Sequence, residues 1–207
     1  MKGKFVTIEG PDGAGKTTQV RKICEYLKSK GYKVMVTREP GGTPLGEKLR
    51  EVLLTLDGES PVPEAEALIY AASRAQLVNK VIRPALESGY IIVCDRFVDS
   101  SLAYQGWARA LGIERLAEIN GWFLKDTWPD LTIVLDIDPA VSLKRISGKK
   151  DRLENEALDF HRKVREGFLK LAALYPDRIR ILDASKDPQQ TFESILLELQ
   201  KSDIIKL

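Results

Sequence analysis

The chain has 207 residues, of which 43% are hydrophobic and 30% charged, as is typical of a folded globular protein. Its 32 basic and 30 acidic residues leave a net charge of +2, so bulk charge indicates neither nucleic acid nor a membrane as partner. The sequence contains no apolar run of the roughly 20 residues that a membrane helix needs, and no signal peptide is recognisable. Cys24 and Cys94 lack metal-ligand spacing and are expected to be buried free thiols. We therefore expect one cytoplasmic domain spanning residues 1–207.

Five short apolar runs are typical of strands. They are continuous rather than alternating, as in IIVCD and TIVLD, which favours parallel strands covered on both faces. The expected strands are Phe5–Glu9, Lys33–Thr37, Tyr90–Asp95, Leu131–Asp136 and Ile179–Leu182.

Helical stretches separate these runs, and the longest is expected to end in a turn that contains Pro84. The alternation of strand and helix predicts an α/β fold with a doubly wound parallel sheet. The expected helices are Lys16–Ser29, Gly46–Leu54, Glu64–Glu87, Ile113–Leu124, Pro139–Ile146, Asn155–Leu174 and Pro188–Ile205.

Polar segments follow all five strands: GPDGAGKT, REPGG, DRF, DIDP and DASKD. Ligands of open α/β sheets bind outside the carboxyl ends of the strands, so we expect these segments to form one site.

The first segment has the pattern GxxxxGKT, follows a strand and opens a helix, which is the context of a phosphate-binding loop. Successive backbone N–H groups of such a loop bind phosphate at a helix N-terminus. Lys16 is expected to reach the β- and γ-phosphates, and the Thr17 hydroxyl to bind Mg²⁺. The alternative, a plain glycine-rich turn, does not account for this context. The residues expected to bind a nucleoside triphosphate are Gly10, Pro11, Asp12, Gly13, Ala14, Gly15, Lys16, Thr17 and Thr18.

The loop does not reveal which molecule receives the phosphate. A regulatory GTPase needs an Asn-Lys-x-Asp signature, but Asn79-Lys80 is followed by Val81-Ile82. A DNA-acting motor is usually longer and more basic. We therefore expect a small molecule to be phosphorylated.

The third expected strand ends at Asp95, and Arg96 follows it directly. Asp95 fits an acidic residue that supports Mg²⁺ through water. A fixed guanidinium at Arg96 could stabilise charge on the transferring phosphoryl group. The alternative is a surface ion pair, which the phosphate-binding loop on the same rim disfavours.

The segments GPDGAGKTTQ, TREPGGTPLGEKLR, YAASRAQ, DRFVDSSLAYQG and DRLE together resemble the thymidylate kinase family, which makes dTDP from dTMP and ATP. They occur in the family's order between residue 5 and about residue 185. The resemblance implies a three-layer α/β/α P-loop NTPase fold with a five-stranded parallel sheet of order 2-3-1-4-5. It also implies ATP and Mg²⁺ as cofactors, dTMP as substrate and a homodimer.

The resemblance also assigns roles within the acceptor site. Asp12 would contact the 3′-hydroxyl, and Arg38 would hold the phosphate of dTMP. Tyr70 and Arg74 are four residues apart on a helix and share a face; in the family this pair stacks on thymine and bonds its edge. Tyr70 departs mildly from the family's usual Phe, and a Tyr at position 104 would crowd a 2′-hydroxyl. The residues expected to bind dTMP are Asp12, Arg38, Tyr70, Arg74, Arg96, Ser101, Tyr104 and Gln105.

The sequence KRISGKKDR, residues 144–152, carries five basic residues and is either a solvated loop or part of a lid over ATP, which we expect to span about 144–155. Some thymidylate kinases have an Arg where this chain has Gly13, and others supply that charge from the lid. This chain resembles the second group. The candidates are Arg145, Lys149, Lys150 and Arg152, with Arg152 the first choice. The residues expected to act in catalysis are Lys16, Arg96, Arg152, Arg145 and Asp12.

Two further hypotheses remain open. Another nucleoside monophosphate kinase or a deoxynucleoside kinase would share the loop but prefer a different acceptor. A nucleotide-binding regulator would hydrolyse NTP slowly, whatever monophosphate is present. His161, the only histidine, lies in the polar segment DFHRKVRE and is expected at the surface.

Overall fold

The computed structural model describes residues 3–56, 59–146 and 151–206. Five strands form one parallel sheet in the order β2-β3-β1-β4-β5, as the sequence predicted. Each end of every strand lies within one residue of its predicted position, because the apolar runs stop where polar segments begin. The strands are β1 (Lys4–Glu9), β2 (Val34–Arg38), β3 (Ile91–Asp95), β4 (Leu131–Asp136) and β5 (Ile179–Asp183).

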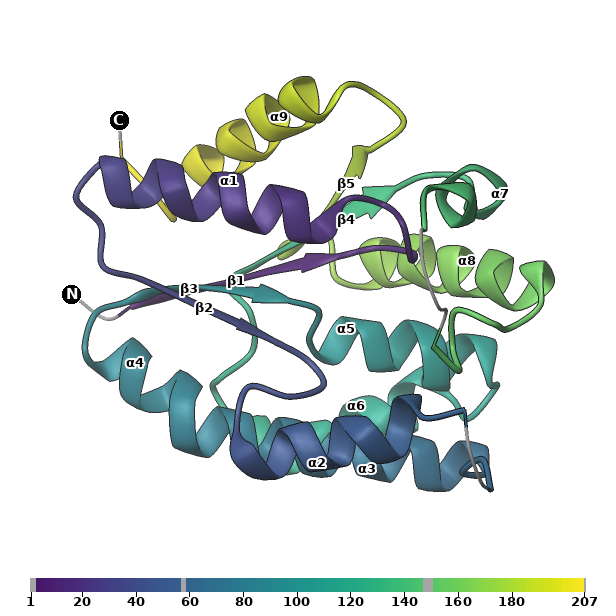
Figure 1. Cartoon of the computed structure of the whole chain (residues 1–207). Helices are drawn as coiled ribbons and strands as arrows, with labels where there is room; N and C mark the ends of the chain where they lie inside the picture. Colours follow the sequence, from purple (N-terminus) through teal and green to yellow (C-terminus); the bar gives the residue numbers. More distant parts are fainter. Residues whose placement is uncertain (1–2, 57–58, 147–150, 207) are drawn as a thin grey trace.

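Helices cover both faces of the sheet (Figure 1). Alternate side chains of a strand point to opposite faces, so Val6 and Ile8 pack with α1 and α9 while Phe5 packs on the other side. Helices α1 (Lys16–Ser29) and α9 (Pro188–Lys201) form one layer. The opposite layer contains α2 (Pro44–Leu54), α3 (Pro63–Leu77), α4 (Arg83–Glu87), α5 (Val98–Ser101), α6 (Ile113–Leu124) and α8 (Leu158–Leu174).

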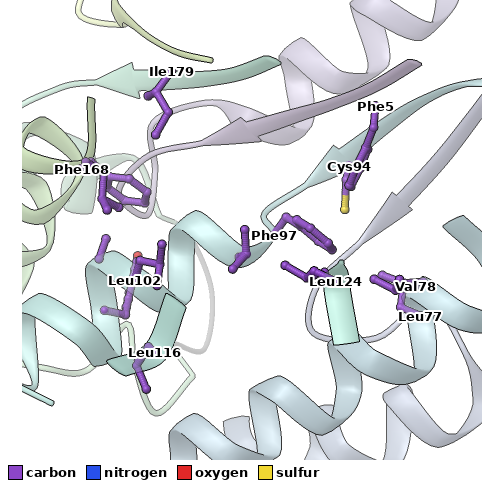
Figure 2. Packing of buried hydrophobic residues seen from close by; sticks show 14 of the residues in the cluster. Phe5, Leu77, Val78, Cys94, Phe97, Leu102, Leu116, Leu124, Phe168 and Ile179 are labelled. Atoms are coloured by element: carbon purple, nitrogen blue, oxygen red, sulfur yellow. The ribbon is translucent and has the colours of Figure 1, made fainter. Parts of the chain in front are cut away.

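The core of the second layer fixes the segment that follows β3. Figure 2 shows Phe97 close to Phe5 and Leu124. The rings of Phe5 and Phe97 meet edge to face with centroids 4.8 Å apart, and both side chains are fully buried. Burying a phenylalanine contributes about 1.5–3 kcal/mol. Phe97 therefore anchors the neighbouring Asp95 and Arg96 at the end of the sheet.

The stretch predicted as one helix, residues 64–87, is divided. Helix α3 ends at Leu77, a π-helical turn spans Val78–Ile82, and α4 follows. Pro84 lies in the first turn of α4 rather than in a terminating turn, since that position does not need its missing N–H.

Residues 98–108 are helical, which the sequence did not indicate. Helix α5 continues into a π-helix, Leu102–Ala108, that packs against α8. Gly167 of α8 permits this approach, because a Cβ atom there would lie 3.1 Å from Ala103 Cα. Ser, Tyr and Gly residues interrupt this stretch, so its apolar residues do not follow a 3.6-residue repeat. The tertiary contact with α8 therefore determines the helix.

Other helix ends differ from the prediction. Helix α2 begins at Pro44, where Thr43 Oγ1 caps it by accepting from Gly46 N at 3.0 Å. Helix α8 begins at Leu158 instead of Asn155, and α9 ends at Lys201. The predicted helix from Pro139 is shorter, with α7 (Pro139–Ser142) followed by one 3₁₀ turn, Leu143–Arg145.

Both cysteines are free and buried, as predicted. The surface prediction for His161 was wrong, because its exposed fraction is 0%. His161 shares a buried stripe of α8 with Val164, Phe168 and Leu171, whose spacing places all four on one helix face. Among the described residues, no helix combines the length and apolar character needed to cross a membrane.

Candidate active site

A cavity of about 540 Å³ lies at the carboxyl ends of β1, β2 and β3. Segments from both layers and from the predicted lid line it, so residues far apart in the sequence meet there. The predicted site residues that line it are Asp12, Gly13, Gly15, Lys16, Thr17, Thr18, Arg38, Tyr70, Arg74, Asp95, Arg96, Ser101, Tyr104, Gln105 and Arg145.

The five polar segments do not all belong to this cavity, so the expectation of one shared site was too broad. The DIDP segment is engaged elsewhere: Asp136 pairs with Arg165 through contacts of 2.7 and 2.8 Å, and Asp138 caps α7. From DASKD, the Ala184 carbonyl accepts a bond from Arg145 Nη1 at 3.4 Å.

The loop after β1 adopts conformations that favour glycine. Gly10, Gly13 and Gly15 have φ values of 134°, 76° and 91°. At Gly13 a Cβ atom would lie 2.0 Å from the carbonyl oxygen of Ser142 in α7, so this position excludes a side chain. The loop is therefore held tightly between β1 and α7.

Lys16 lies folded against this loop. Its Nζ donates to the carbonyl oxygens of Gly10 at 3.1 Å and Pro11 at 2.9 Å. Burial, followed by the nearby Arg96 cation, lowers the pKa of Lys16 to about 8. The ammonium is still charged at neutral pH and could bind a phosphate.

Thr17 and Asp95 bring two oxygen ligands together from α1 and β3. Thr17 Oγ1 donates to Asp95 Oδ2 at 2.8 Å. Mg²⁺ prefers oxygen ligands and usually takes most of them from phosphates and water. This donor set fits such an ion, and among the residues described here no cluster of three or more His, Cys, Asp or Glu offers an all-protein metal site.

Asp12 and Arg96 both line the cavity and form an ion pair. Arg96 Nη1 also donates to Ser100 Oγ at 3.0 Å, and Tyr104 Oη donates to Asp12 Oδ2 at 3.0 Å. Burial acts to raise the pKa of Asp12, but the neighbouring cations Arg96 and Lys16 outweigh it and lower the pKa to about 2. Asp12 is therefore ionised, and Arg96 supplies the compensating charge that a carboxylate in a phosphate-binding loop requires.

Arg74 is a buried hub on α3 with an exposed fraction of only 1%. Its Nε donates to Glu39 at 2.8 Å, Nη1 to Asn120 Oδ1 at 2.8 Å and Nη2 to Ser101 Oγ at 3.0 Å. Burial raises the pKa of Glu39 to about 7, although Arg74 opposes the shift. These contacts fix the guanidinium at the cavity wall, one helical turn from Tyr70.

Two arginines lie near the loop after β2. Arg38 pairs with Glu47 at 2.8 Å, and the same carboxylate accepts from Gly42 N at 2.8 Å. Arg50 of α2 donates to the Pro40 carbonyl at 3.0 Å and lines the cavity. Sequence reasoning assigned Arg50 no role, although it ends the segment TREPGGTPLGEKLR.

Glu9 was also missed. Its carboxylate is fully buried and accepts from Phe97 N at 2.7 Å and from Ser100 Oγ at 2.5 Å. Burial, reinforced by the nearby Asp99, raises the pKa of Glu9 to about 8. It therefore supports the serine that binds Arg96.

The lid candidates occupy different places. Arg145 lines the cavity. Arg152 is not among the lining residues: its Nη2 lies 2.5 Å from Glu66 Oε2, and its Nε donates to the Leu53 carbonyl at 2.8 Å. Lys149 and Lys150 lie outside the described residues.

A glycine-rich loop between β1 and α1, its lysine, and an aspartate of β3 bonded to the loop threonine lie on a sheet of order 2-3-1-4-5. These features define the P-loop NTPase fold.

Comparison with known proteins narrows this class. The sequence model described as thymidylate kinase matches residues 8–195. A thymidylate kinase from a Geobacillus species is 48% identical over 196 residues, covering 93% of each chain. One from Caldanaerobacter subterraneus is 50% identical, covering 90% of each. The crystal structure of thymidylate kinase from Ehrlichia chaffeensis superposes with a TM-score of 0.79 at 32% identity, covering 97% of this chain and 100% of that one. The chain belongs to the thymidylate kinase family.

Proposed function

We propose that this chain transfers the γ-phosphoryl group of ATP to the phosphate of dTMP, giving dTDP and ADP. The observation that carries the proposal is that one cavity is lined by the phosphate-binding loop and also by residues of α3 and of the π-helix after α5, and we call these two parts its donor and acceptor compartments. Lys16 and Thr17 of the phosphate-binding loop line one of them, while Tyr70, Arg74 and Gln105 line the other. Family membership supports the same reaction.

In the donor compartment, backbone N–H groups of residues 12–18 and the Lys16 ammonium would hold the phosphates of ATP. Thr17 and Asp95 would hold Mg²⁺, Thr17 directly and Asp95 through water. The ion would bring positive charge to the phosphates when bound. The 2.8 Å contact between these two side chains supports the assignment.

In the acceptor compartment, Arg38 would bind the phosphate of dTMP, and Arg50 is a second candidate for the same role. Tyr70 would stack on the thymine ring, while Arg74 and Gln105 would bind its edge; Ser101 would complete this side by bonding Arg74. Asp12 would meet the 3′-hydroxyl, with Tyr104 beside the sugar. The hydrogen bond of Tyr104 to Asp12, 3.0 Å, supports placing both near a deoxyribose.

The transfer step needs positioning and charge more than a base. The attacking phosphate oxygen of dTMP is already anionic, so no residue has to remove a proton from it. Lys16, Arg96 and Arg145 would stabilise charge on the transferring group. Arg152 would join them only after leaving Glu66, to which it is bound at 2.5 Å.

The test is ADP release from ATP and Mg²⁺ with dTMP, dUMP, other nucleoside monophosphates, or no acceptor. Release should depend on an acceptor and be fastest with dTMP. A preference for another monophosphate would indicate a different nucleotide kinase. ATP hydrolysis indifferent to every acceptor would instead favour a nucleotide-binding regulator.

We further propose a homodimer formed by α2, α3 and α6. Each of these neighbouring helices exposes large apolar side chains, namely Val52 at 56%, Leu68 at 56% and Trp122 at 84%. Exposed apolar surface of this kind favours association, and a second copy of the chain is the expected partner. Trp122→Glu should shift the mass in sedimentation toward a monomer, and an unchanged mass would contradict this interface.

We also propose that the whole chain acts as one domain in the cytoplasm. The two free, buried cysteines suit a reducing compartment, and the five described strands form one sheet.

A further inference from the structure

Glu66 on α3 contacts both the acceptor compartment and the predicted lid. Its side chain is only 1% exposed. Oε1 accepts a hydrogen bond from Gln105 Nε2 at 2.8 Å, and Oε2 lies 2.5 Å from Arg152 Nη2. Gln105 lines the cavity, whereas Arg152 lies in residues 151–156, C-terminal to α7 and its 3₁₀ turn. One buried carboxylate therefore connects two elements that sequence separates by almost 50 residues.

A second arginine reinforces this connection. Arg109 Nη2 lies 3.4 Å from Glu66 Oε2 and 2.5 Å from Glu156 Oε1. Its guanidinium also stacks over Phe160, 4.4 Å from the ring centroid. Because Glu156 and Arg152 lie in the same segment, residues 151–156 are held through charges at both ends.

The same segment also contacts α2. Arg152 Nε donates to the Leu53 carbonyl at 2.8 Å, and its backbone N donates to the Leu54 carbonyl at 3.3 Å. Asp151, Leu153 and Leu54 all line the cavity. The segment is therefore attached to the helices of the acceptor compartment rather than to the phosphate-binding loop.

We propose that Glu66 is a positioning residue that couples the acceptor compartment to residues 151–156, which we call the lid segment. When Gln105 moves toward a bound acceptor, its hydrogen bond to Glu66 changes. The position of the Glu66 carboxylate relative to Arg152 and Arg109 then changes with it. Release of Arg152 toward the phosphates in turn leaves Glu66 with fewer cations, which a buried carboxylate resists. By linkage, acceptor binding then alters donor binding, and donor binding alters acceptor binding by the same factor.

This inference rests on the proposed reaction, with dTMP as acceptor and ATP as donor. An inert ion pair that only stabilises the fold is the competing explanation. The two differ in one quantity, namely the ratio of dissociation constants for a non-hydrolysable ATP analogue measured without and with saturating dTMP.

The first variant is Glu66→Gln, which keeps the shape and an oxygen for Gln105 but removes the charge that holds the arginines. Calorimetry on the wild-type chain should give a ratio that differs from one by at least about fivefold. In Glu66→Gln the ratio should fall to within about twofold of one. Glu64→Gln, an exposed site on the same helix, makes the same chemical change and should keep the wild-type ratio.

Arg152→Gln provides the second variant, which removes the lid side of the contact and leaves Glu66 with Gln105. It should lose the coupling to the same extent, and combining it with Glu66→Gln should cause no further loss. If Glu66→Gln does not fold, as judged by thermal melting, Arg152→Gln alone decides.

Wild-type coupling retained in folded Glu66→Gln or in Arg152→Gln overturns the inference. A wild-type ratio of one does so too, even if dTMP is phosphorylated normally. Failure of the wild-type chain to phosphorylate dTMP overturns the proposed function instead.

Discussion

Replacing Arg74 with alanine should affect stability and acceptor binding together. The Arg74 guanidinium lies 2.6 Å from the Glu39 carboxylate, and both side chains are buried. Arg74→Ala therefore leaves Glu39 without its arginine, and Asn120 and Ser101 without their donor. Because Arg74 acts to lower the pKa of Glu39, that pKa should rise above its present value of about 7 in the variant.

The expected loss of stability is large. Removing one partner of a buried ion pair costs about 3–5 kcal/mol, out of a typical total of about 5–15 kcal/mol for a domain. Adding Glu39→Gln to Arg74→Ala removes the buried carboxyl group that Arg74 no longer stabilises. The double variant should therefore be more stable than the sum of the two single losses, by about 1–3 kcal/mol.

Urea unfolding followed by tryptophan fluorescence measures these losses, and steady-state kinetics measures binding. A lost hydrogen bond to a buried base edge is worth about 1–3 kcal/mol, so the KM for dTMP should rise by about 5- to 150-fold. The KM for ATP should stay nearly constant, since the phosphate-binding loop is untouched. A stability loss below about 1 kcal/mol, or equal increases in both KM values, would refute this account of Arg74.

Other substitutions test the remaining assignments. Lys16→Ala should abolish ADP release without altering the circular dichroism spectrum, and normal turnover would remove Lys16 from the donor site. Tyr70→Phe should be nearly neutral, whereas Tyr70→Ala should raise the KM for dTMP by about 5- to 150-fold if the ring stacks on the base; equal effects would exclude stacking. Arg145→Ala or Arg152→Ala should lower kcat by at least about 10²-fold with little change in the KM for dTMP. Wild-type kcat in both of these variants and in Lys149→Ala and Lys150→Ala would contradict a lid mechanism. Burial raises the pKa of Glu9 from 4.5 to about 8. Between these two pH values the folded chain holds a proton on Glu9 that the unfolded chain releases. The contribution of Glu9 to stability is therefore complete below pH 4.5 and declines up to about pH 8. Glu9→Gln removes that decline. Urea unfolding between pH 5 and pH 8 should show the stability of the wild type falling relative to the variant by on the order of a few kcal/mol, at about 1.4 kcal/mol per pH unit. Parallel pH profiles of the two proteins would contradict the raised pKa of Glu9.

Strand positions could be predicted from sequence because each buried run ends abruptly at polar residues. Helix ends depend more on caps and neighbours. Thr43 caps α2, which begins two residues before the expected start, and the π-helical turn that precedes α4 has no signature in the sequence. Helix α5 and the following π-helix form on the surface offered by α8 near Gly167, a tertiary contact that local propensity does not contain.

The phosphate-binding loop was predictable because its spacing alone specifies a backbone conformation. The supporting residues were not. Glu9 and Asn120 act through burial and distant partners, which single-residue patterns do not reveal. His161 shows a different failure: its segment is polar, yet its spacing to Val164 and Phe168 marks a buried helical stripe, and that spacing could have placed it inside.

The lid illustrates a limit of reasoning from charge. Arg145 and Arg152 are equivalent as basic residues in a loop, but one lines the cavity and the other pairs with Glu66. Only the arrangement of α3 beside the lid segment separates them. The sequence could therefore identify the set of candidates and not their order.

The close contact between Gly13 and α7 has a consequence for how such enzymes diverge. A Cβ atom at position 13 would lie 2.0 Å from the Ser142 carbonyl, and α7 leads within three residues to Arg145. Gly13→Arg as a single change should therefore be disfavoured, because the loop cannot accept a side chain until the backbone of α7 moves. That movement would displace Arg145. A lineage that carries its arginine in the loop and one that carries it in the lid are thus separated by at least two linked changes. Position 13 and α7 should be inherited as a pair.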